Sequence, residues 1–266
     1  MNSYYDSIYL SPHLDDAIMS CGGQIYQQIQ TGKIVLVVTV MAGDPPNGEL
    51  SCFAKSLQER WELATDAVAA RRNEDAEACH LLGVDYLHWD IPDCIYRVNP
   101  AGGEALYASE EAIFGQIHTA EYDLINDLVR YMTNLPTHNR ILIPLAIGQH
   151  VDHQLLRTAA ERWQNKSGMA YYEEYPYARD FAAISTALTQ KGILYPEVIP
   201  LSEEALSAKI KAAGCYRSQI STFFDSLQDL GTQITHYSQK VGGERLWYTR
   251  ENEADSSIGP IALIDP

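Results

Sequence analysis

The sequence predicts an α/β fold, a three-layer Rossmann-like sandwich around a mainly parallel sheet. Up to about Tyr171, short apolar runs alternate with segments of helical spacing. The run 33–40 is β-branched and apolar on both faces, which is typical of a central strand that helices cover on both sides. Polar segments follow the ends of several runs, and the carboxyl ends of parallel strands are where such folds bind ligands.

The first two predicted strands each lead into a polar turn or loop. Ser7–Leu10 is a short apolar run that ends at Ser11-Pro12, and Asp16–Ile29 then carries apolar residues along one helical face. Lys33–Val40 is the next strand. The loop after it, Gly43–Ser51, is rich in Pro and Gly and long enough to be functional.

The middle of the chain continues the alternation. Lys55–Leu82 has helical spacing and stops at Gly83, a common residue after a helix. Tyr86–Trp89 follows as a strand, and Ile91–Gly103 is a loop rich in Pro and Gly. Glu111–Met132 again has helical spacing, which predicts another long helix.

One more strand and helix precede a region where the pattern loosens. Ile141–Pro144 is a short buried strand, and Asp152–Trp163 is the helix after it. Beyond Tyr171, Ser202–Ala212 is helical with Ser202 in the N-cap position. Gly242–Tyr248 is the last segment whose pattern can be interpreted.

Length and charge limit the class of protein and its partners. We expect the 266 residues to form a single domain, 1–266, whose part from about residue 178 is less regular. Nineteen lysines and arginines oppose 35 aspartates and glutamates, so the formal charge is −16. Because such a surface repels phosphates, the sequence argues against nucleic acid and anionic membrane as partners. The sequence does not determine the oligomeric state, and it allows a homo-oligomer.

Neither a membrane span nor a targeting signal is visible in the sequence. No apolar stretch approaches the roughly 18 residues of a span, and residues 1–6 hold no basic segment followed by an apolar run. The five cysteines are scattered and form no CxxC pair. This pattern argues against a disulfide framework and against a thiolate zinc site. We therefore expect a cytoplasmic protein.

The segment 11–17, at the end of the first strand, carries the clearest chemistry. His13 and Asp16 are three residues apart across a strand-to-helix turn, so both side chains can point at one ion. An imidazole nitrogen and a carboxylate oxygen are zinc ligands, and a catalytic zinc with three protein ligands keeps one position open for water. Asp15, between them, is placed to take a proton from that water.

A second motif, 148–153, supplies the third ligand. It also follows a predicted strand, so His150 and His153 reach the same edge of the sheet. One of these histidines completes a site of two imidazoles and one carboxylate, and the other is left to hydrogen-bond the substrate. The metal and a fixed donor together stabilise the oxyanion that forms when water attacks a carbonyl.

Each motif also has a plainer explanation. Asp15 or Asp16 is suited to cap the following helix, where a carboxylate also meets the helix dipole favourably. His150 and His153 can be a surface pair at positions i and i+3. Capping gives no reason, however, for histidines at the ends of two strands, so the joint occurrence favours a metal site.

These residues carry a family resemblance. Pro12–Asp16, followed by Cys21–Gly23 and far downstream by His150–His153, resembles the PIG-L/LmbE family of zinc-dependent N-deacetylases. The likeness covers the chain up to about Tyr177. The family's usual opening is Pro-His-Pro-Asp-Asp-Glu; here Leu14 replaces the second proline and Ala17 the glutamate. Neither change removes a metal ligand.

The resemblance implies a role for each residue of the two motifs. It implies zinc, or another divalent transition metal, bound by His13, Asp16 and His153. Asp15 is then the general base, and His150 polarises the carbonyl or protonates the leaving amine. Asp152 orients a histidine from outside the ligand set.

Three further segments resemble parts of the family pattern or suit a sugar. Arg71 matches an arginine that contacts a sugar hydroxyl, although an ion pair with Glu74 on the same helix explains it equally well. Asp93 matches an aspartate that helps bind substrate, although turn aspartates are common. The aromatic run Tyr171–Tyr177 is suited to wall a sugar pocket, although core packing is the commoner fate of such residues. Arg245 and Trp247 raise the same alternatives.

The leading hypothesis is a metal-dependent amidohydrolase that removes an N-acetyl group from an amino-sugar-type substrate, giving acetate and a free amine. The same site on a different small N-acylated amine is one alternative, since loops set the substrate. A metal-binding or ligand-binding α/β protein without turnover is another. A nucleotide-dependent transferase is disfavoured because the glycine fingerprint of such sheets is missing.

Overall fold

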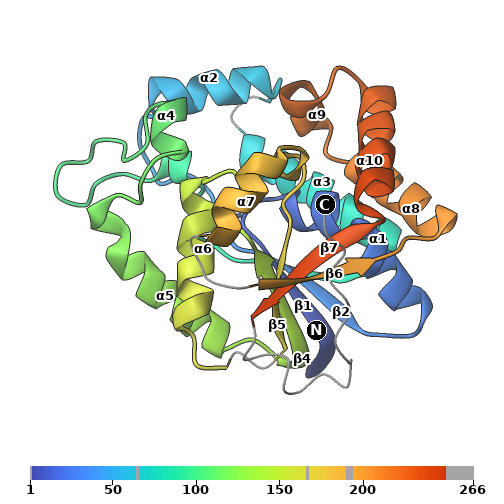
Figure 1. The fold of residues 1–266 in the computed structure, drawn as a ribbon. Helices are drawn as coiled ribbons and strands as arrows, with labels where there is room; N and C mark the ends of the chain where they lie inside the picture. The colour runs from blue at the N-terminus through green and yellow to red at the C-terminus, as the bar shows by residue number, and fades with distance from the viewer. Residues whose placement is uncertain (1, 64–65, 166–167, 190–193, 250–266) are drawn as a thin grey trace.

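A mainly parallel sheet forms the centre of the protein (Figure 1). The structure, a computed structural model, describes residues 2–63, 66–165, 168–189 and 194–249. In these residues seven strands form one sheet in the order β3-β2-β1-β4-β5-β7-β6. Neighbours among β1 to β5 pair in parallel, whereas β7 runs antiparallel to both β5 and β6. The strands are β1 Tyr4–Ser11, β2 Val35–Thr39, β3 Asp85–His88, β4 Thr137–Pro144, β5 Met169–Tyr172, β6 Leu194–Ile199 and β7 Glu244–Thr249.

Helices cover both faces of the sheet. Helices α1, α3 and α8 pack together on one face, and α5 and α6 pack together on the other (Figure 1). Every residue of β2 is buried between these layers, as its apolar sequence predicts. The predicted α/β sandwich is therefore confirmed. The helices are α1 Asp16–Gln30, α2 Cys52–Arg60, α3 Ala67–Leu82, α4 Glu110–Ile113, α5 Tyr122–Thr133, α6 Val151–Arg162, α7 Phe181–Thr189, α8 Glu203–Ala213, α9 Arg217–Phe223 and α10 Leu227–Val241.

The long helix predicted over Lys55–Leu82 is in fact two helices, α2 and α3. Helix α2 ends at Arg60, and Glu62 then adopts a φ of 55°, a left-handed conformation that interrupts a helix. Trp61, at the break, is buried and packs over the Arg71 guanidinium, 4.8 Å from the ring centre. The left-handed Glu62 ends the helical path, and the helical spacing of the sequence does not register it.

The helix predicted over Glu111–Met132 is also interrupted. Helix α4 has one turn and ends at Ile113, and α5 begins only at Tyr122. Gly115 and a 3-10 turn, η2 (Thr119–Glu121), lie between them, and the His118 side chain caps that turn. The glycine and the cap are local signals that end a helix. The prediction overlooked them because apolar residues continue at helical spacing across the interruption.

Regular structure continues beyond residue 178, where the sequence pattern loosens. Ser202 caps α8, since its hydroxyl accepts a hydrogen bond from the Ala205 N–H at 3.1 Å. Strand β7 enters the sheet between β5 and β6, and its Arg245 and Trp247 side chains donate to the buried Glu173. These two residues therefore anchor β7 to the end of β5. The end of the predicted domain, 250–266, lies outside the described residues.

None of the helices in the described ranges has both the length and the apolar character that crossing a bilayer requires.

A buried ion pair joins the C-terminal elements to α1. Lys209, on α8, donates to Glu244 at the start of β7 at 2.8 Å and to the Ser20 carbonyl at 2.9 Å. Glu244 also accepts from the backbone N–H groups of Gly23 and Gln24 at 3.0 and 2.9 Å. Both charged side chains are almost fully buried, at 3% and 2% exposure. The pair therefore holds α1, α8 and β7 in one arrangement.

The Lys209→Met variant should be strongly destabilised, because it leaves the Glu244 carboxylate buried without its counter-ion. We expect a loss of about 3–5 kcal/mol in the free energy of unfolding, measured by urea denaturation. The matched control is Lys55→Met, which breaks the exposed pair with Glu49 and should change stability little. Equal effects of the two substitutions would contradict this account.

Candidate active site

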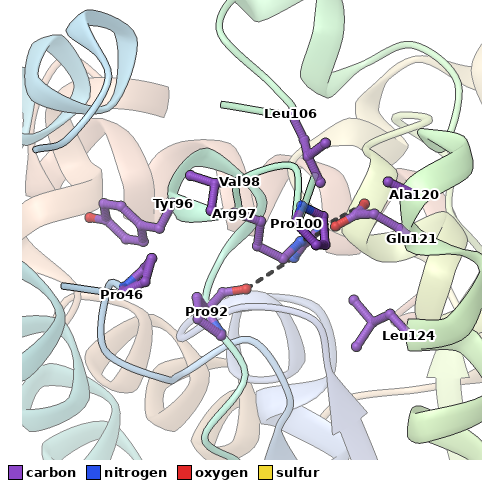
Figure 2. Close-up of a pocket in the computed structure, with 10 residues that line it drawn as sticks. All are labelled: Pro46, Pro92, Tyr96, Arg97, Val98, Pro100, Leu106, Ala120, Glu121 and Leu124. Atoms are coloured by element: carbon purple, nitrogen blue, oxygen red, sulfur yellow. Dashed lines mark hydrogen bonds and ion pairs between the residues drawn. The ribbon is translucent and has the colours of Figure 1, made fainter. Parts of the chain in front are cut away.

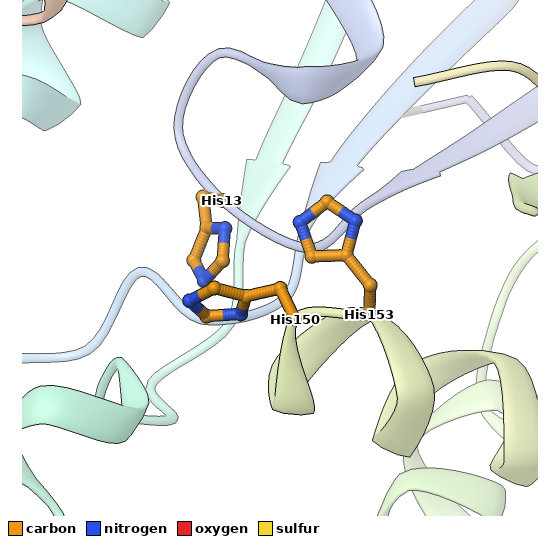
Figure 3. Close-up of side chains that lie close together, drawn as sticks. All are labelled: His13, His150 and His153. Carbon is orange, nitrogen blue, oxygen red and sulfur yellow. The ribbon is translucent and has the colours of Figure 1, made fainter. Parts of the chain in front are cut away.

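The two motifs from opposite halves of the chain meet at one edge of the sheet. Strands β1 and β4 are parallel neighbours, so the segments that leave their carboxyl ends lie side by side. His13 follows β1, whereas His150 and His153 stand at the start of α6. The three imidazole rings lie together (Figure 3), with the His13 ring centre 4.7 Å from that of His150 and 5.2 Å from that of His153.

Helix α1 is capped without either aspartate. Asp15 is the N-cap residue, yet its side chain makes no capping hydrogen bond. The Ser11 hydroxyl accepts from the Ala17 N–H at 3.0 Å instead, and Asp16 accepts from the His13 N–H at 2.8 Å. Helix capping therefore does not explain the Asp-Asp pair, and both carboxylates are available to the site.

One oxygen of Asp16 stands between two imidazoles. Its Oδ2 lies 3.3 Å from His13 Nδ1 and 3.3 Å from His153 Nε2. Zinc bonds of about 2.0–2.2 Å in a tetrahedral site place neighbouring ligand atoms roughly 3.3–3.6 Å apart. The contacts of Asp16 with each nitrogen therefore have the spacing of ligands on one ion. His13, His150 and His153 each offer a ring nitrogen, and these three nitrogens lie within 4.8 Å of one another.

The other nitrogen of each of these two imidazoles is held by a buried carboxylate. His13 Nε2 lies 3.0 Å from Asp152 Oδ2, and His153 Nδ1 lies 3.0 Å from Glu174 Oε1. Such carboxylates fix the ring orientation of metal-binding histidines and raise their basicity. His153 Nε2, by contrast, is buried without a hydrogen-bond partner among the described residues. It is the atom that faces Asp16, so a cation would satisfy it.

The charges of the cluster also favour a cation. Burial alone would lower the pKa of His13, but Asp93, Asp152 and Asp16 raise it well above its usual value. Burial likewise opposes protonation of His153, but Asp16 and Glu174 raise its pKa to about 9. Without a metal, protons therefore neutralise the carboxylates here. A divalent ion supplies the same positive charge and releases those protons on binding. The donor set, two imidazoles and one carboxylate, fits such an ion.

Asp15 lies beside this cluster in a state suited to proton transfer. Burial first and the charge of Asp16 second raise its pKa to about 7, against the opposing effect of Arg71. The guanidinium of Arg71 is 3.8 Å from Asp15 Oδ1, beyond hydrogen-bond distance. A carboxyl group with a pKa near neutrality can both accept and donate a proton under working conditions.

Arg71 and Asp93 lie together beside Asp15 and His13, with Asp93 Oδ2 3.8 Å from His13 Nε2. Arg71 Nη1 is 3.9 Å from Asp93 Oδ2, and its buried Nε has no hydrogen-bond partner in the part of the chain that the structure describes. Glu74, the alternative partner of Arg71, accepts instead from the backbone and hydroxyl of Ser218. Asp93 does cap a turn, since Oδ1 accepts from the Ile95 N–H at 3.2 Å. Its second oxygen nevertheless faces the site.

His150 is bound differently from the other two histidines. Its Nδ1 accepts from the backbone N–H of Asp152 at 3.3 Å, and its Nε2 lies 3.9 Å from the Cys94 sulfur. Burial and the neighbouring His13 lower its pKa well below the usual value, so the ring is neutral. Because Nδ1 accepts a hydrogen bond, the neutral ring carries its proton on Nε2.

Aromatic rings bound the histidine side of the site. Phe114, on α4, packs edge-on against His150 at 5.4 Å, and Tyr177 packs edge-on against His153 at 6.0 Å. Phe114 and Tyr177 also contact each other, at 6.2 Å. In the aromatic run predicted as a pocket wall, Tyr171, Tyr172 and Tyr175 are instead buried in the core. The wall prediction is thus wrong for those three residues.

The structure adds two residues that the sequence did not single out. Glu174 lay inside the aromatic run and is fully buried against His153. Arg97 lay in the predicted loop 91–103 and donates to Asp152. Glu174 could have been noticed in the sequence, because it is a charged residue inside an aromatic segment. No sequence signal pointed to Arg97. Arg245 and Trp247 belong to the Glu173 cluster and do not contact the site in the described chain.

Comparisons with known proteins give consistent matches. Residues 8–164 match the family model described as PIG-L: GlcNAc-PI de-N-acetylase. A 2'-N-acetylparomamine deacetylase of Niallia circulans is 30% identical over 188 residues, 64% of this chain and 66% of that protein. The chain thus spans about two thirds of the length of this relative. A protein of the same name from Streptomyces fradiae is 26% identical over 221 residues, 80% of this chain and 73% of that protein.

A solved structure is similar over nearly the whole chain. The zinc-inhibited form of a teicoplanin deacetylase superposes with a TM-score of 0.77 at 28% sequence identity, covering 91% of this chain and 97% of that one.

The cluster should bind one equivalent of a divalent transition metal. Metal-free protein dialysed against zinc or cobalt should retain about one ion per chain by elemental analysis, and His153→Ala should lose it, because the site then keeps only two ligands. His138→Ala is the control, since His138 stacks on Trp163 away from the cluster. Full metal content in His153→Ala would rule out this ligand set.

Proposed function

This chain belongs to the PIG-L family of de-N-acetylases, and we propose that it is a zinc-dependent enzyme that removes the N-acetyl group of an amino-sugar substrate. The predicted family and the hydrolytic deacetylase class are confirmed by this match and by relatives named as deacetylases. The observation that carries the proposal is the position of Asp16 Oδ2, at 3.3 Å from a ring nitrogen of both His13 and His153.

The proposed reaction combines one ion with fixed groups of the chain. Zinc held by His13, Asp16 and His153 would supply a Lewis acid that makes water a nucleophile at neutral pH and polarises an acyl carbonyl. Asp152 and Glu174 hold the two imidazoles in position from behind. The ligand atoms are therefore preorganised, and little reordering is needed when metal and substrate bind.

Asp15 moves the proton. With a pKa of about 7, it has a substantial ionised fraction near neutrality, and that fraction accepts a proton from the attacking water. The water oxygen bonds to the acyl carbon, and the bond from that carbon to nitrogen breaks. Asp15 then returns the proton to nitrogen, which regenerates the carboxylate and gives a free amine and acetic acid. The acid releases its remaining proton to solvent and is then acetate.

His150 is suited to bind the acyl oxygen. Its neutral ring carries a proton on Nε2, because Nδ1 already accepts from the Asp152 backbone. A fixed N–H donor at this place would stabilise the negative charge that develops on the oxygen. Of the two roles implied for His150, carbonyl polarisation therefore fits better than protonation of the amine.

A sugar would fit the remaining walls. Arg71 has an unsatisfied buried donor and lies beside Asp93, which offers an acceptor, so together they suit vicinal hydroxyl groups. Phe114 and Tyr177, which contact each other and border His150 and His153, offer aromatic rings on which the C–H face of a pyranose would pack. The names of the two curated relatives support an acetylated amino sugar over other acylated amines.

The activity is tested by acetate release from a panel of N-acetylated amino sugars, 2'-N-acetylparomamine included. Because zinc inhibits the teicoplanin deacetylase, metal-depleted protein receives one equivalent of zinc rather than an excess. Wild type should then release acetate, and Asp15→Asn should keep its zinc but turn over about 10²–10⁴ times more slowly. Asp44→Asn, an exposed change, should match wild type.

Two results would count against this assignment. Wild-type turnover by Asp15→Asn removes Asp15 from the mechanism. Zinc-loaded wild type that binds an amino sugar yet releases no acetate is a ligand-binding protein without turnover.

Arg71→Met should weaken substrate binding more than chemistry. Loss of one charged hydrogen bond to a hydroxyl is worth about 1.5–3 kcal/mol, or roughly a 10- to 150-fold rise in KM. The neighbouring Arg72→Met is the matched control, because Arg72 points to Asp44 and the Ala42 carbonyl rather than into the site. Steady-state kinetics separate the two, and an unchanged KM in Arg71→Met would show that Arg71 does not contact the sugar.

A further inference from the structure

Arg97 is a buried cation between two carboxylates that belong to different parts of the chain. Its Nη2 donates to Asp152 Oδ1 at 2.6 Å and to Glu121 Oε2 at 3.2 Å, and its Nε donates to the other oxygen of Glu121. Its Nη1 donates to the Pro92 carbonyl at 3.0 Å (Figure 2). Nη1 also lies 3.9 Å from the Met41 sulfur. The five N–H groups of the guanidinium are therefore matched by contacts within the described chain.

Asp152 depends on this contact for its orientation. Its side chain is fully buried, and Oδ1 accepts from Arg97. Its Oδ2 accepts from the Cys94 N–H at 3.0 Å and lies 3.0 Å from His13 Nε2. The carboxylate is thus fixed by Arg97 and Cys94 on one side and presents one oxygen to the His13 ring on the other.

The anchor of Arg97 is itself fixed. Glu121 Oε2 also accepts from the Tyr107 hydroxyl at 2.6 Å, and that hydroxyl accepts from the His118 N–H at 2.8 Å. Two carboxylate oxygens bound to one planar guanidinium fix both the plane and the position of that group. A lysine ammonium is a point charge and cannot be fixed in this way. The chain Tyr107–Glu121–Arg97–Asp152–His13 is continuous, with a hydrogen-bond distance at each step.

We propose that Arg97 is a positioning residue of the active site: it holds Asp152 so that the His13 ring presents Nδ1 to Asp16. The proposal rests on the ligand role of His13 in the proposed function. It assigns no substrate contact to Arg97, whose effect passes through Asp152.

A cavity beside Arg97 makes the proposal testable by chemical rescue. It has a volume of about 280 Å³, and Arg97 and Glu121 line it together with apolar residues such as Pro100, Leu106 and Leu124 (Figure 2). Truncation of Arg97 would join the vacated space to this cavity. A guanidinium ion from solution can then reach Glu121 and Asp152 and replace the missing group.

The test uses three variants of the full chain. Arg97→Lys keeps the charge but loses the planar fork, Arg97→Ala removes both, and Arg157→Lys is the control. Arg157 is also buried but donates to the Leu145 carbonyl and to Glu161. Each variant is measured for zinc affinity by competition with a chelator, for kcat and KM, and for the ¹⁵N-edited NMR signals that report the His13 tautomer. Because the NMR readout also works on metal-free protein, it does not depend on turnover.

Arg97→Lys should bind zinc roughly 10- to 100-fold more weakly and lose kcat with little change in KM, as when a partner behind a metal-binding histidine is lost. The His13 signals should change, and those of the Arg157→Lys control should not. Millimolar guanidinium should restore part of the zinc affinity of Arg97→Ala. If Arg97→Ala does not fold, Arg97→Lys carries the test alone.

The opposite results separate the two proposals. Wild-type zinc affinity and wild-type His13 signals in Arg97→Lys overturn the role of Arg97 while leaving the deacetylase assignment intact. A wild type that neither binds zinc nor releases acetate overturns the proposed function, and the NMR comparison then still decides whether Arg97 orients His13.

Discussion

The site depends on one carboxylate oxygen, Asp16 Oδ2, that contacts two imidazoles from distant parts of the chain. Three features of the fold make this contact possible. The parallel pairing of β1 with β4 places the two motifs side by side. The Ser11 hydroxyl caps α1, which frees Asp16 from that task. Each imidazole is then turned to Asp16 by a buried carboxylate on its other nitrogen. If any one of these three features were lost, His13, Asp16 and His153 would still be present but would no longer face one another.

Burial gives this arrangement its electrostatic character. Unpaired charges inside a protein are costly, so a group of buried carboxylates must acquire positive charge from somewhere. Arg97 neutralises part of the charge at Asp152, and protons on His13 and His153 neutralise much of the rest, as their raised pKa values indicate. A metal ion bound here would replace these mobile protons with a fixed charge. Asp15, whose pKa lies near 7, remains the group whose proton can still be exchanged.

Sequence patterns predicted the parts of the molecule that obey local rules. The strand ends could be located because fully buried strands read as apolar runs, and the parallel topology then implied that 11–17 and 148–153 converge. The break at Trp61 could not be predicted, because helical spacing registers neither the left-handed Glu62 nor the contact of the indole with Arg71. Glu174 and Arg97 were missed because their partners are more than 20 residues away: His153 for Glu174, and Asp152 and Glu121 for Arg97. No spacing rule encodes such contacts.

Two hydrophobic clusters support the residues that would bind metal and those that would contact a substrate. Tyr177 packs against the core of the sheet. A second cluster, separate from that core, forms around α2, η1 (Cys94–Tyr96) and α4. It reaches the site at several points. Trp61 packs on Arg71, the Cys94 backbone donates to Asp152, Val151 precedes Asp152 in the chain, and the Tyr107 hydroxyl donates to Glu121, which holds Arg97. Substitutions in this second cluster should therefore alter substrate binding and metal geometry together, because the same cluster supports both Arg71 and Asp152.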